Sequence, residues 1–251
     1  MSMKASFEGR SVLVTGGARG IGLAIAKKFC EAGATVTVLD QDESQLEIVS
    51  KTLDGIRTIS CNLGDWEGTR SKIASLGPFH HLVNNAGVAR PAETLLNIKP
   101  ASIDDVFGIN FKSMVNVTQV VAEGMIESKV ENGTIVNMSS ISDSVAVPGM
   151  ALYSASKAAV TMLTKSCALE LAPHSIRVNC VRPAMVRTEQ VGRLAGSNAV
   201  LEQAIKINER RVIPRMVEMD EVADSVLFLS STASSMTTGS DILLDGGIFT
   251  R

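Results

Sequence analysis

Short runs of apolar, β-branched residues alternate along the whole chain with longer segments whose apolar residues recur at helical spacing. This alternation predicts an α/β fold with a parallel sheet covered on both faces, because parallel strands are joined by helical crossovers. We expect strands at Ser11–Thr15, Thr35–Leu39, Arg57–Cys61, His81–Asn84, Gly133–Ser139, Ile176–Val181 and Asp241–Leu244. We expect helices near Gly20–Ala32, Glu43–Thr52, Trp66–Leu76, Ile103–Ser128, Ala151–Leu171, Glu189–Asn208 and Asp220–Ser230. With no repeats or linkers, residues 1–251 are expected to form a single domain.

The composition argues against several classes of protein. The 251 residues are 45% hydrophobic and only 20% charged, which is enough for one substantial core. The net charge of −2 argues against a nucleic-acid partner, which would require a basic stripe on the surface. No apolar run reaches the ~20 residues of a membrane span, and the N-terminus has no apolar signal core. The four cysteines match no metal-site spacing, so we expect reduced thiols, no metal and a cytoplasmic location.

A glycine-rich turn lies between the first expected strand and the first expected helix. Gly16, Gly20 and Gly22 follow the pattern Gly-x-x-x-Gly-x-Gly in this turn. Glycines allow a tight turn and a close approach of the backbone, and a helix N-terminus attracts the pyrophosphate of a dinucleotide. The pattern therefore predicts a phosphate cradle; the alternative is a glycine-rich strand-to-helix turn that binds no ligand.

Tyr153 and Lys157 are four residues apart in Tyr-Ser-Ala-Ser-Lys, and Ser140 lies thirteen positions upstream of Tyr153. On a helix, positions i and i+4 share a face, so the phenol and the ammonium are expected side by side. A positive charge beside a phenol lowers its pKa from about 10 and lets it exchange a proton with a substrate near neutral pH. Such a pair is common on helix surfaces and by itself is a weak sign of catalysis. The glycine-rich turn, which predicts a dinucleotide in the same protein, makes a catalytic role more specific.

The chain resembles the short-chain dehydrogenase/reductase family in motifs that occur in order over nearly its whole length. These are Gly16-x-x-x-Gly20-x-Gly22, Asn84-Asn85-Ala86-Gly87, Asn110, Ser140, Tyr153-x-x-x-Lys157, Pro183 with Thr188, and Thr238-Gly239-Ser240 to Asp245-Gly246-Gly247. A closer likeness, to dicarbonyl/L-xylulose reductases, lies in Asn62-Leu63-Gly64-Asp65-Trp66, Leu82-Val83-Asn84-Asn85-Ala86 and Met162-Leu163-Thr164-Lys165. The resemblance implies a Rossmann-type, doubly wound parallel sheet of seven strands. It also implies a homotetramer in which helices Ile103–Ser128 and Ala151–Leu171 pack against partner copies.

The resemblance implies a role for each catalytic candidate. Tyr153 would be the general acid in reduction and the base in oxidation, and Lys157 would lower the pKa of Tyr153 and bind the nicotinamide ribose. Ser140 would position the substrate oxygen, and Asn110 would help to hold a water relay to bulk solvent. The alternative for each is an ordinary structural polar group. For Ser139 the structural role is the better interpretation, because Ser140 has the thirteen-residue offset of the family.

Asp40 bears on the choice between NAD and NADP. It follows the second expected strand, where a carboxylate can accept both adenosine ribose hydroxyls of NAD and would repel the 2′-phosphate of NADP. The alternative is a turn-forming aspartate. Arg19 favours NADP, because a guanidinium in the glycine turn could pair with that phosphate. Related L-xylulose reductases carry a basic residue where this chain has Gln41, so NAD(H) is favoured and NADP(H) remains possible.

The remaining cofactor contacts follow from the resemblance. Asn62 would accept a hydrogen bond from the adenine, Thr188 would bond the nicotinamide carboxamide, and Asn84, Ala86 and Gly87 would form a turn beside the adenosine ribose. The full expected set is Gly16, Arg19, Gly20, Ile21, Gly22, Asp40, Asn62, Leu63, Asn84, Ala86, Gly87, Tyr153, Lys157, Pro183, Val186 and Thr188.

The substrate pocket is expected beneath a lid near residues 189–215, with walls formed by Ser140, Ile141, Val147, Met150 and Tyr153. Polyol-handling relatives have polar side chains where Ile141 and Met150 stand, so this wall is apolar and puts L-xylulose in doubt. The expected reaction is hydride transfer between nicotinamide and a carbonyl compound or secondary alcohol, such as a dicarbonyl, an L-xylulose- or xylitol-like sugar, or another small ketone. The alternative is a catalytically silent nucleotide-binding sensor or scaffold, against which the intact catalytic residues argue.

Overall fold

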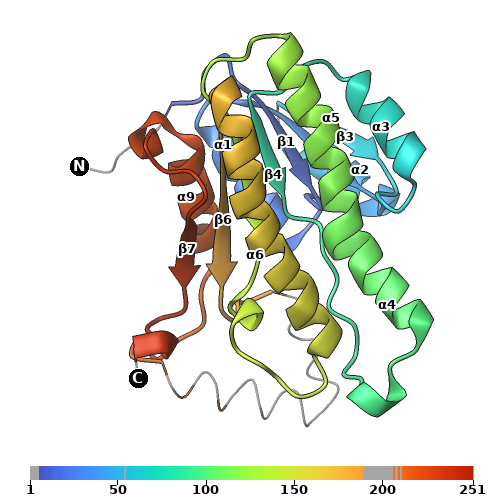
Figure 1. Cartoon of the computed structure of the whole chain (residues 1–251). Coiled ribbons are helices and arrows are strands. Elements are labelled where there is room, and N and C mark those ends of the chain that lie inside the picture. Colours follow the sequence, from blue (N-terminus) through green and yellow to red (C-terminus); the bar gives the residue numbers. More distant parts are fainter. Residues whose placement is uncertain (1–5, 54, 189–205, 207–208, 210, 251) are drawn as a thin grey trace.

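A parallel sheet of seven strands forms the centre of the computed structural model, which describes residues 6–53, 55–188, 206, 209 and 211–250 (Figure 1). The strand order is β3-β2-β1-β4-β5-β6-β7. The strands are β1 (Ser11–Thr15), β2 (Thr35–Asp40), β3 (Ile56–Ser60), β4 (His81–Asn84), β5 (Gly133–Met138), β6 (Ile176–Pro183) and β7 (Asp241–Leu244). The predicted doubly wound sheet is confirmed, with strand ends that differ from the predictions by at most two residues.

Helices cover both faces of this sheet (Figure 1). They are α1 (Gly20–Glu31), α2 (Glu43–Thr52), α3 (Trp66–Ala74), α4 (Pro100–Phe107), α5 (Ser113–Glu127), α6 (Ala151–Leu171) and α9 (Met219–Ser230). Alternate residues of β1 point into two separate cores: Val12 and Val14 pack with Phe29 of α1, whereas Leu13 packs with Val121 of α5. Because helices bury both faces, the strands are almost continuously apolar.

The helix predicted over Ile103–Ser128 is interrupted in the structure. Helices α4 and α5 are separated by a π-helical turn at Gly108–Lys112, which contains the fully buried Asn110. The side chain of Asn110 bonds to the backbone of Val88, a tertiary contact that accompanies the wider turn. The prediction of one helix was wrong here because apolar periodicity does not reveal a single π-helical turn, a feature that often occurs at functional sites.

The order of the strands places a crevice at their carboxyl ends. Strand β1 pairs with β2 on one side and with β4 on the other, so the connections that leave β1 and β4 diverge. Helix α6 has the bounds that the sequence predicted and runs beside this crevice. Most of the helix predicted over Glu189–Asn208, and most of the lid predicted near 189–215, lie outside the described residues.

Candidate active site

A cleft of about 1930 Å³ crosses the carboxyl ends of the strands. Segments that follow β1, β2, β3, β4, β5 and β6 all contribute to its walls, as a doubly wound sheet requires. The predicted site residues that line it are Gly16, Arg19, Gly20, Ile21, Gly22, Asp40, Asn62, Leu63, Ala86, Gly87, Ser140, Ile141, Val147, Met150, Tyr153, Lys157, Pro183, Val186 and Thr188. Asn84 and Asn110 are the two predicted residues that do not line it.

The glycine-rich turn has the geometry of a cradle for an anion. Gly16 has a φ of +64°, and a Cβ at this position would lie 2.8 Å from Cα of Ala86. A Cβ on Gly22 would lie 2.2 Å from the carbonyl oxygen of Gly16. Among the described residues, no side chain caps the N-terminus of α1 and its first turn contains no acidic residue. The backbone N–H groups there are thus available to an anion from the cleft, and the turn fits the pyrophosphate of a dinucleotide.

The carboxylate of Asp40, at the end of β2, is oriented by the backbone. Its Oδ2 accepts a hydrogen bond from the N–H of Ala18, and its Oδ1 accepts one from the N–H of Asp42, each at 3.1 Å. Each carboxylate oxygen keeps lone-pair capacity for a ribose hydroxyl. The nearby guanidinium of Arg19 forms an ion pair with Asp42. The cation that could attract a 2′-phosphate is therefore already engaged by a carboxylate.

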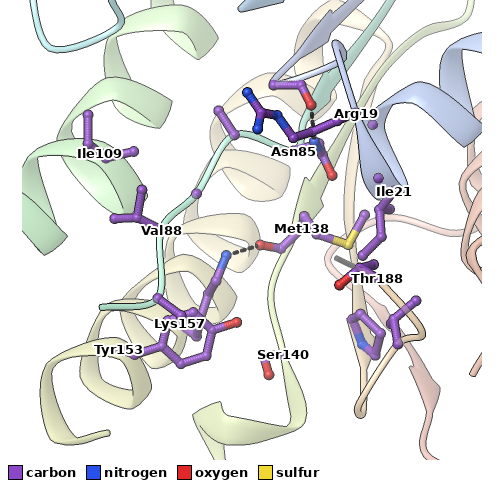
Figure 2. A pocket seen from close by; sticks show the side chains of 18 of the residues that line it. Arg19, Ile21, Asn85, Val88, Ile109, Met138, Ser140, Tyr153, Lys157 and Thr188 are labelled. Carbon is purple, nitrogen blue, oxygen red and sulfur yellow. Dashed lines mark hydrogen bonds between the residues drawn. The ribbon is translucent and has the colours of Figure 1, made fainter. Parts of the chain in front are cut away.

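Tyr153, Lys157 and Ser140 converge in the part of the cleft shown in Figure 2. The Nζ atom of Lys157 lies 5.7 Å from the centre of the Tyr153 ring and donates to the carbonyl oxygen of Met138 at 2.7 Å. The hydroxyl of Ser140 lies close enough to the phenol of Tyr153 to favour its ionised form. The Oγ atom of Ser140 also accepts from the N–H of Ser142 at 3.1 Å. One face of α6 thus presents the phenol and the ammonium together, as the four-residue spacing predicted.

Burial dominates the proton affinities of this group. It raises the pKa of Tyr153 above its ordinary value, and the nearby hydroxyl of Ser140 offsets only part of this effect. It lowers the pKa of Lys157 to about 8. The pKa of Tyr153 is thus raised in this structure and not lowered as predicted, because the burial of the phenolate outweighs the favourable effect of Ser140. At neutral pH Tyr153 therefore holds its proton, as a proton donor must.

Asn110 lies behind the cleft wall. Its Oδ1 accepts from the N–H of Val88 at 2.7 Å, and its Nδ2 donates to the carbonyl oxygen of Val88 and to Oγ of Ser156, each at 3.0 Å. Ser156 in turn donates to the carbonyl oxygen of Tyr153 at 2.7 Å. Both amide N–H groups of Asn110 are thus committed to the protein, and only its Oδ1 keeps capacity for the expected water relay.

Asn84 does not contact the cleft, so the prediction that it touches the cofactor is not supported. Its Nδ2 donates to Oγ1 of Thr118 and to Oδ1 of Asn137, each at 2.9 Å, within the buried interior. The adjacent Asn85 lines the cleft instead, and its Nδ2 donates to the carbonyl oxygen of Gly16 at 2.9 Å. Neighbouring side chains on an extended segment point to opposite sides, so the sequence could have indicated that only one of the two asparagines faces the cleft.

A buried network connects the segment after Ser140 with α6 and the sheet. The carboxylate of Asp143 accepts from Nη2 of Arg182 at 2.5 Å and from Oγ1 of Thr161 at 2.6 Å. Arg182 also pairs with Asp241, at 2.9 Å. Thr161 shares a hydrogen bond of 2.7 Å with the hydroxyl of Ser139. Ser139 is thus a structural residue, as the sequence interpretation held.

The end of the cleft that holds Tyr153 is mostly apolar. Ile141 and Met150 are buried and line it together with Val147, as predicted. Val88 and Ile109 also line it, and the sequence analysis missed them because only the fold brings their loop and the π-helical turn beside α6. It also missed a set of arginines, namely Arg90, Arg187 and Arg211. No motif marked these, because they follow no fixed spacing from the catalytic residues.

The described residues contain neither a candidate metal site nor a candidate membrane span. No group of three or more His, Cys, Asp or Glu side chains is placed there to hold a metal ion. In the same part of the chain, no helix is long and apolar enough to cross a membrane.

The chain is similar over nearly its whole length to several reductases. A family model described as enoyl-(acyl carrier protein) reductase matches residues 16–249. The chain is 40% identical over 247 residues to D-erythrulose reductase of Gallus gallus and 41% identical over 245 residues to carbonyl reductase (NADPH) 2 of Sus scrofa, with 98% of both chains covered in each case. It is 37% identical over 247 residues to L-xylulose reductase of Homo sapiens, with 98% of this chain and 99% of that protein covered.

Solved structures share the fold as well. A 3-oxoacyl-(acyl-carrier protein) reductase of Brucella melitensis with bound NAD is similar at a TM-score of 0.86 and 31% identity. That match covers 96% of this chain and 92% of the other.

Proposed function

The chain belongs to the short-chain dehydrogenase/reductase family and is an oxidoreductase that transfers a hydride between nicotinamide and a carbonyl compound or secondary alcohol; we propose that Tyr153 exchanges the proton of this reaction. The observation that carries this proposal is the convergence of Tyr153, Ser140 and Lys157 in one cleft. A bound dinucleotide would supply or accept the hydride.

In the direction of reduction, Tyr153 would donate its proton to the substrate oxygen. Its raised pKa keeps the phenol protonated at neutral pH, ready for this step. Ser140 would stabilise the same oxygen by donating its hydroxyl proton, since its Oγ already accepts from the N–H of Ser142. In the direction of oxidation the same groups would act in reverse, with Tyr153 as the base.

Lys157 would bind the ribose next to the nicotinamide. An ammonium has three N–H donors, and one of them is used by the carbonyl oxygen of Met138 at 2.7 Å. The other two remain for ribose hydroxyls. This arrangement supports the ribose contact that the family resemblance implied, although burial, and not Lys157, sets the direction of the pKa shift of Tyr153.

The adenosine end of the cleft favours NAD(H) over NADP(H). The oriented carboxylate of Asp40 can accept ribose hydroxyls, and it would repel a 2′-phosphate. Arg19 is paired with Asp42, which weakens the attraction it could offer to that phosphate. The name of the Sus scrofa relative specifies NADPH and the Brucella melitensis structure holds NAD, so the relatives point in both directions. The oriented carboxylate of Asp40 and the engaged Arg19 are the features of this chain that favour NAD(H).

The substrate would be a small ketone or dicarbonyl with an apolar body, because Ile141, Val147 and Met150 line the cleft near Tyr153. Spectrophotometric assays of diketones, xylulose and polyols, each with NADH or NADPH or their oxidised forms, test this proposal. Among these uncharged compounds, we expect the fastest turnover with a diketone. No turnover of any carbonyl or alcohol with either cofactor, by folded protein that binds the dinucleotide, would favour a silent sensor instead.

The protein would assemble as a homotetramer through α5 and α6. Met162 and Leu169 of α6 are 61% and 80% exposed, and Ile126 of α5 is 36% exposed. Large apolar side chains on the outer faces of two helices favour packing against another copy. Sedimentation velocity at micromolar concentration tests this: a tetramer is expected, and a pure monomer would refute it.

A further inference from the structure

Arg211 is a buried cation in the cleft that forms no ion pair with a carboxylate of the described residues. It is 5% exposed and lines the cleft. Its Nη1 donates to the carbonyl oxygen of Arg215, and its Nη2 donates to the carbonyl oxygen of Met185 at 3.3 Å. Its Nε is buried and has no hydrogen-bond partner among the described residues. Burial lowers the pKa of Arg211 from its ordinary value, and the charge of Asp245 only partly opposes this.

Two partly buried arginines of the described structure are satisfied differently. Arg177 has four oxygen partners around its guanidinium, which holds the end of α9. Arg182 also has an unpartnered Nε, but two carboxylates, of Asp143 and Asp241, compensate its charge. Arg211 has neither a full set of acceptors nor an ion pair within the described residues, and a buried, uncompensated charge is costly. Such a group is retained most readily where a ligand brings the missing anion.

The position of Arg211 in the fold indicates which ligand could supply the anion that it lacks. Met185 follows the end of β6, and the N–H of Val212 donates to the carbonyl oxygen of Gly246, which follows β7. Arg211 therefore lies at the β6–β7 side of the cleft. The pyrophosphate cradle follows β1, three strands from β6 in the sheet, or ~14 Å at ~4.8 Å per strand. Ser140 follows β5, the direct neighbour of β6.

We propose that Arg211 binds a carboxylate carried by the substrate, so that this enzyme acts on a small keto acid or hydroxy acid. The free Nε and the remaining N–H bonds of Nη1 and Nη2 suit a carboxylate, which a guanidinium binds through parallel hydrogen bonds. The apolar residues Ile141, Val147 and Met150 would then contact the body of the substrate between its carbonyl and its carboxylate. This inference rests on the proposed function and names the substrate class of the same site.

The test compares keto acids with their uncharged amides, which have nearly the same shape. Pyruvate, acetoacetate and levulinate place the ketone at increasing distances from the carboxylate, and each is assayed beside its amide with NADH and NADPH. For the acid of the fitting length, kcat/KM should exceed that of its amide by ~10-fold or more. In Arg211→Met this ratio should fall to about one. The ratio is independent of the fraction of enzyme that is folded, since both substrates are assayed on one preparation.

The matched control is Arg90→Met, because Arg90 also lines the cleft but is paired with Asp105. This control should keep the preference of the wild type for the acid, and Arg211→Lys should keep part of it. If the wild type shows no preference for any acid, or if Arg211→Met keeps the preference, the inference is overturned. It is also overturned if Arg211→Met weakens dinucleotide binding while the preference remains. Turnover of neutral diketones tests the proposed function separately, so the two failures are distinguishable.

Discussion

The ammonium of Lys157 lies 5.7 Å from the centre of the Tyr153 ring, yet both side chains have their pKa shifted against their charged forms. Burial raises the pKa of Tyr153 and lowers that of Lys157 to about 8. The pair is therefore arranged as a protonated phenol beside a cation that titrates within reach of physiological pH. This favours proton donation by Tyr153, and it makes the charge of Lys157 sensitive to pH.

Binding of the dinucleotide is expected to weaken as the pH rises through about 8, the pKa of Lys157. Above this value the side chain loses its charge and one of its N–H donors. Fluorescence titration of NADH at several pH values between neutrality and mild alkali gives the Kd. The Lys157→Met variant should bind more weakly at neutral pH and lose the step near the pKa. A step of the same size in the variant would assign the titration to another group.

The same shift links Lys157 to stability. An unfolded lysine titrates near ~10.4, above the folded value of about 8, so the unfolded state binds more protons between these two pH values. The contribution of Lys157 to the free energy of unfolding should therefore rise with pH across this window. Denaturant unfolding gives the free energy of unfolding of the wild type and of Lys157→Met at each pH. The difference between their slopes against pH measures the contribution of Lys157. Equal slopes would contradict the lowered pKa.

Cofactor preference is expected to depend on Asp40, Arg19 and Asp42 together. NADH should bind more tightly than NADPH, because a carboxylate beside a 2′-phosphate costs on the order of 1 kcal/mol in a solvated site. Asp40→Ser should shift the preference toward NADPH, and Arg19→Ala should shift it further toward NADH. Asp42→Asn releases Arg19 from its ion pair and should also favour NADPH. Titrations of both reduced cofactors give the ratios, and tighter NADPH binding by the wild type would show that Arg19 dominates.

The glycine turn is expected to tolerate no side chain at Gly22. A Cβ there would lie 2.2 Å from the carbonyl oxygen of Gly16, so Gly22→Ala should displace the turn and cost ~1–3 kcal/mol of stability. Dinucleotide affinity should fall with it. The control is Gly124→Ala in α5, where a Cβ meets no atom of the described residues within 4 Å and helix propensity should improve by up to ~1 kcal/mol. Thermal unfolding and NADH titration measure both effects, and equal behaviour of the two variants would contradict the cradle geometry.

Much of the fold followed from local signals in the sequence, and the errors share one physical cause. Strands β1 and β4 and helix α6 were predicted with their observed bounds, since apolar runs and periodicity are strong there. The π-helical turn at Gly108–Lys112 and the ion pair of Arg19 were not predicted. Each depends on contacts between residues that are distant in the chain, and no local sequence pattern reveals such contacts.

Positioning of Ser140 is expected to depend on Asp143. This carboxylate is buried between Arg182 and Thr161, so Asp143→Asn should lower the free energy of unfolding by ~1–3 kcal/mol. It should also lower kcat several-fold with little change in dinucleotide Kd, because the segment that holds Ser140 loses its anchor. Asp241→Asn removes the more exposed partner of Arg182 and serves as the control, with a loss below ~1 kcal/mol. Equal losses of kcat in the two variants would refute this role.

The central claim is that Tyr153 exchanges the proton of the hydride-transfer reaction, and Tyr153→Phe tests it most directly. This variant removes one oxygen atom and keeps the ring that lies beside Lys157. With a substrate that the wild type turns over, kcat should fall at least ~10²-fold, while the NADH Kd from fluorescence titration stays near the wild-type value. A variant that binds NADH normally and keeps most of its turnover would contradict the claim.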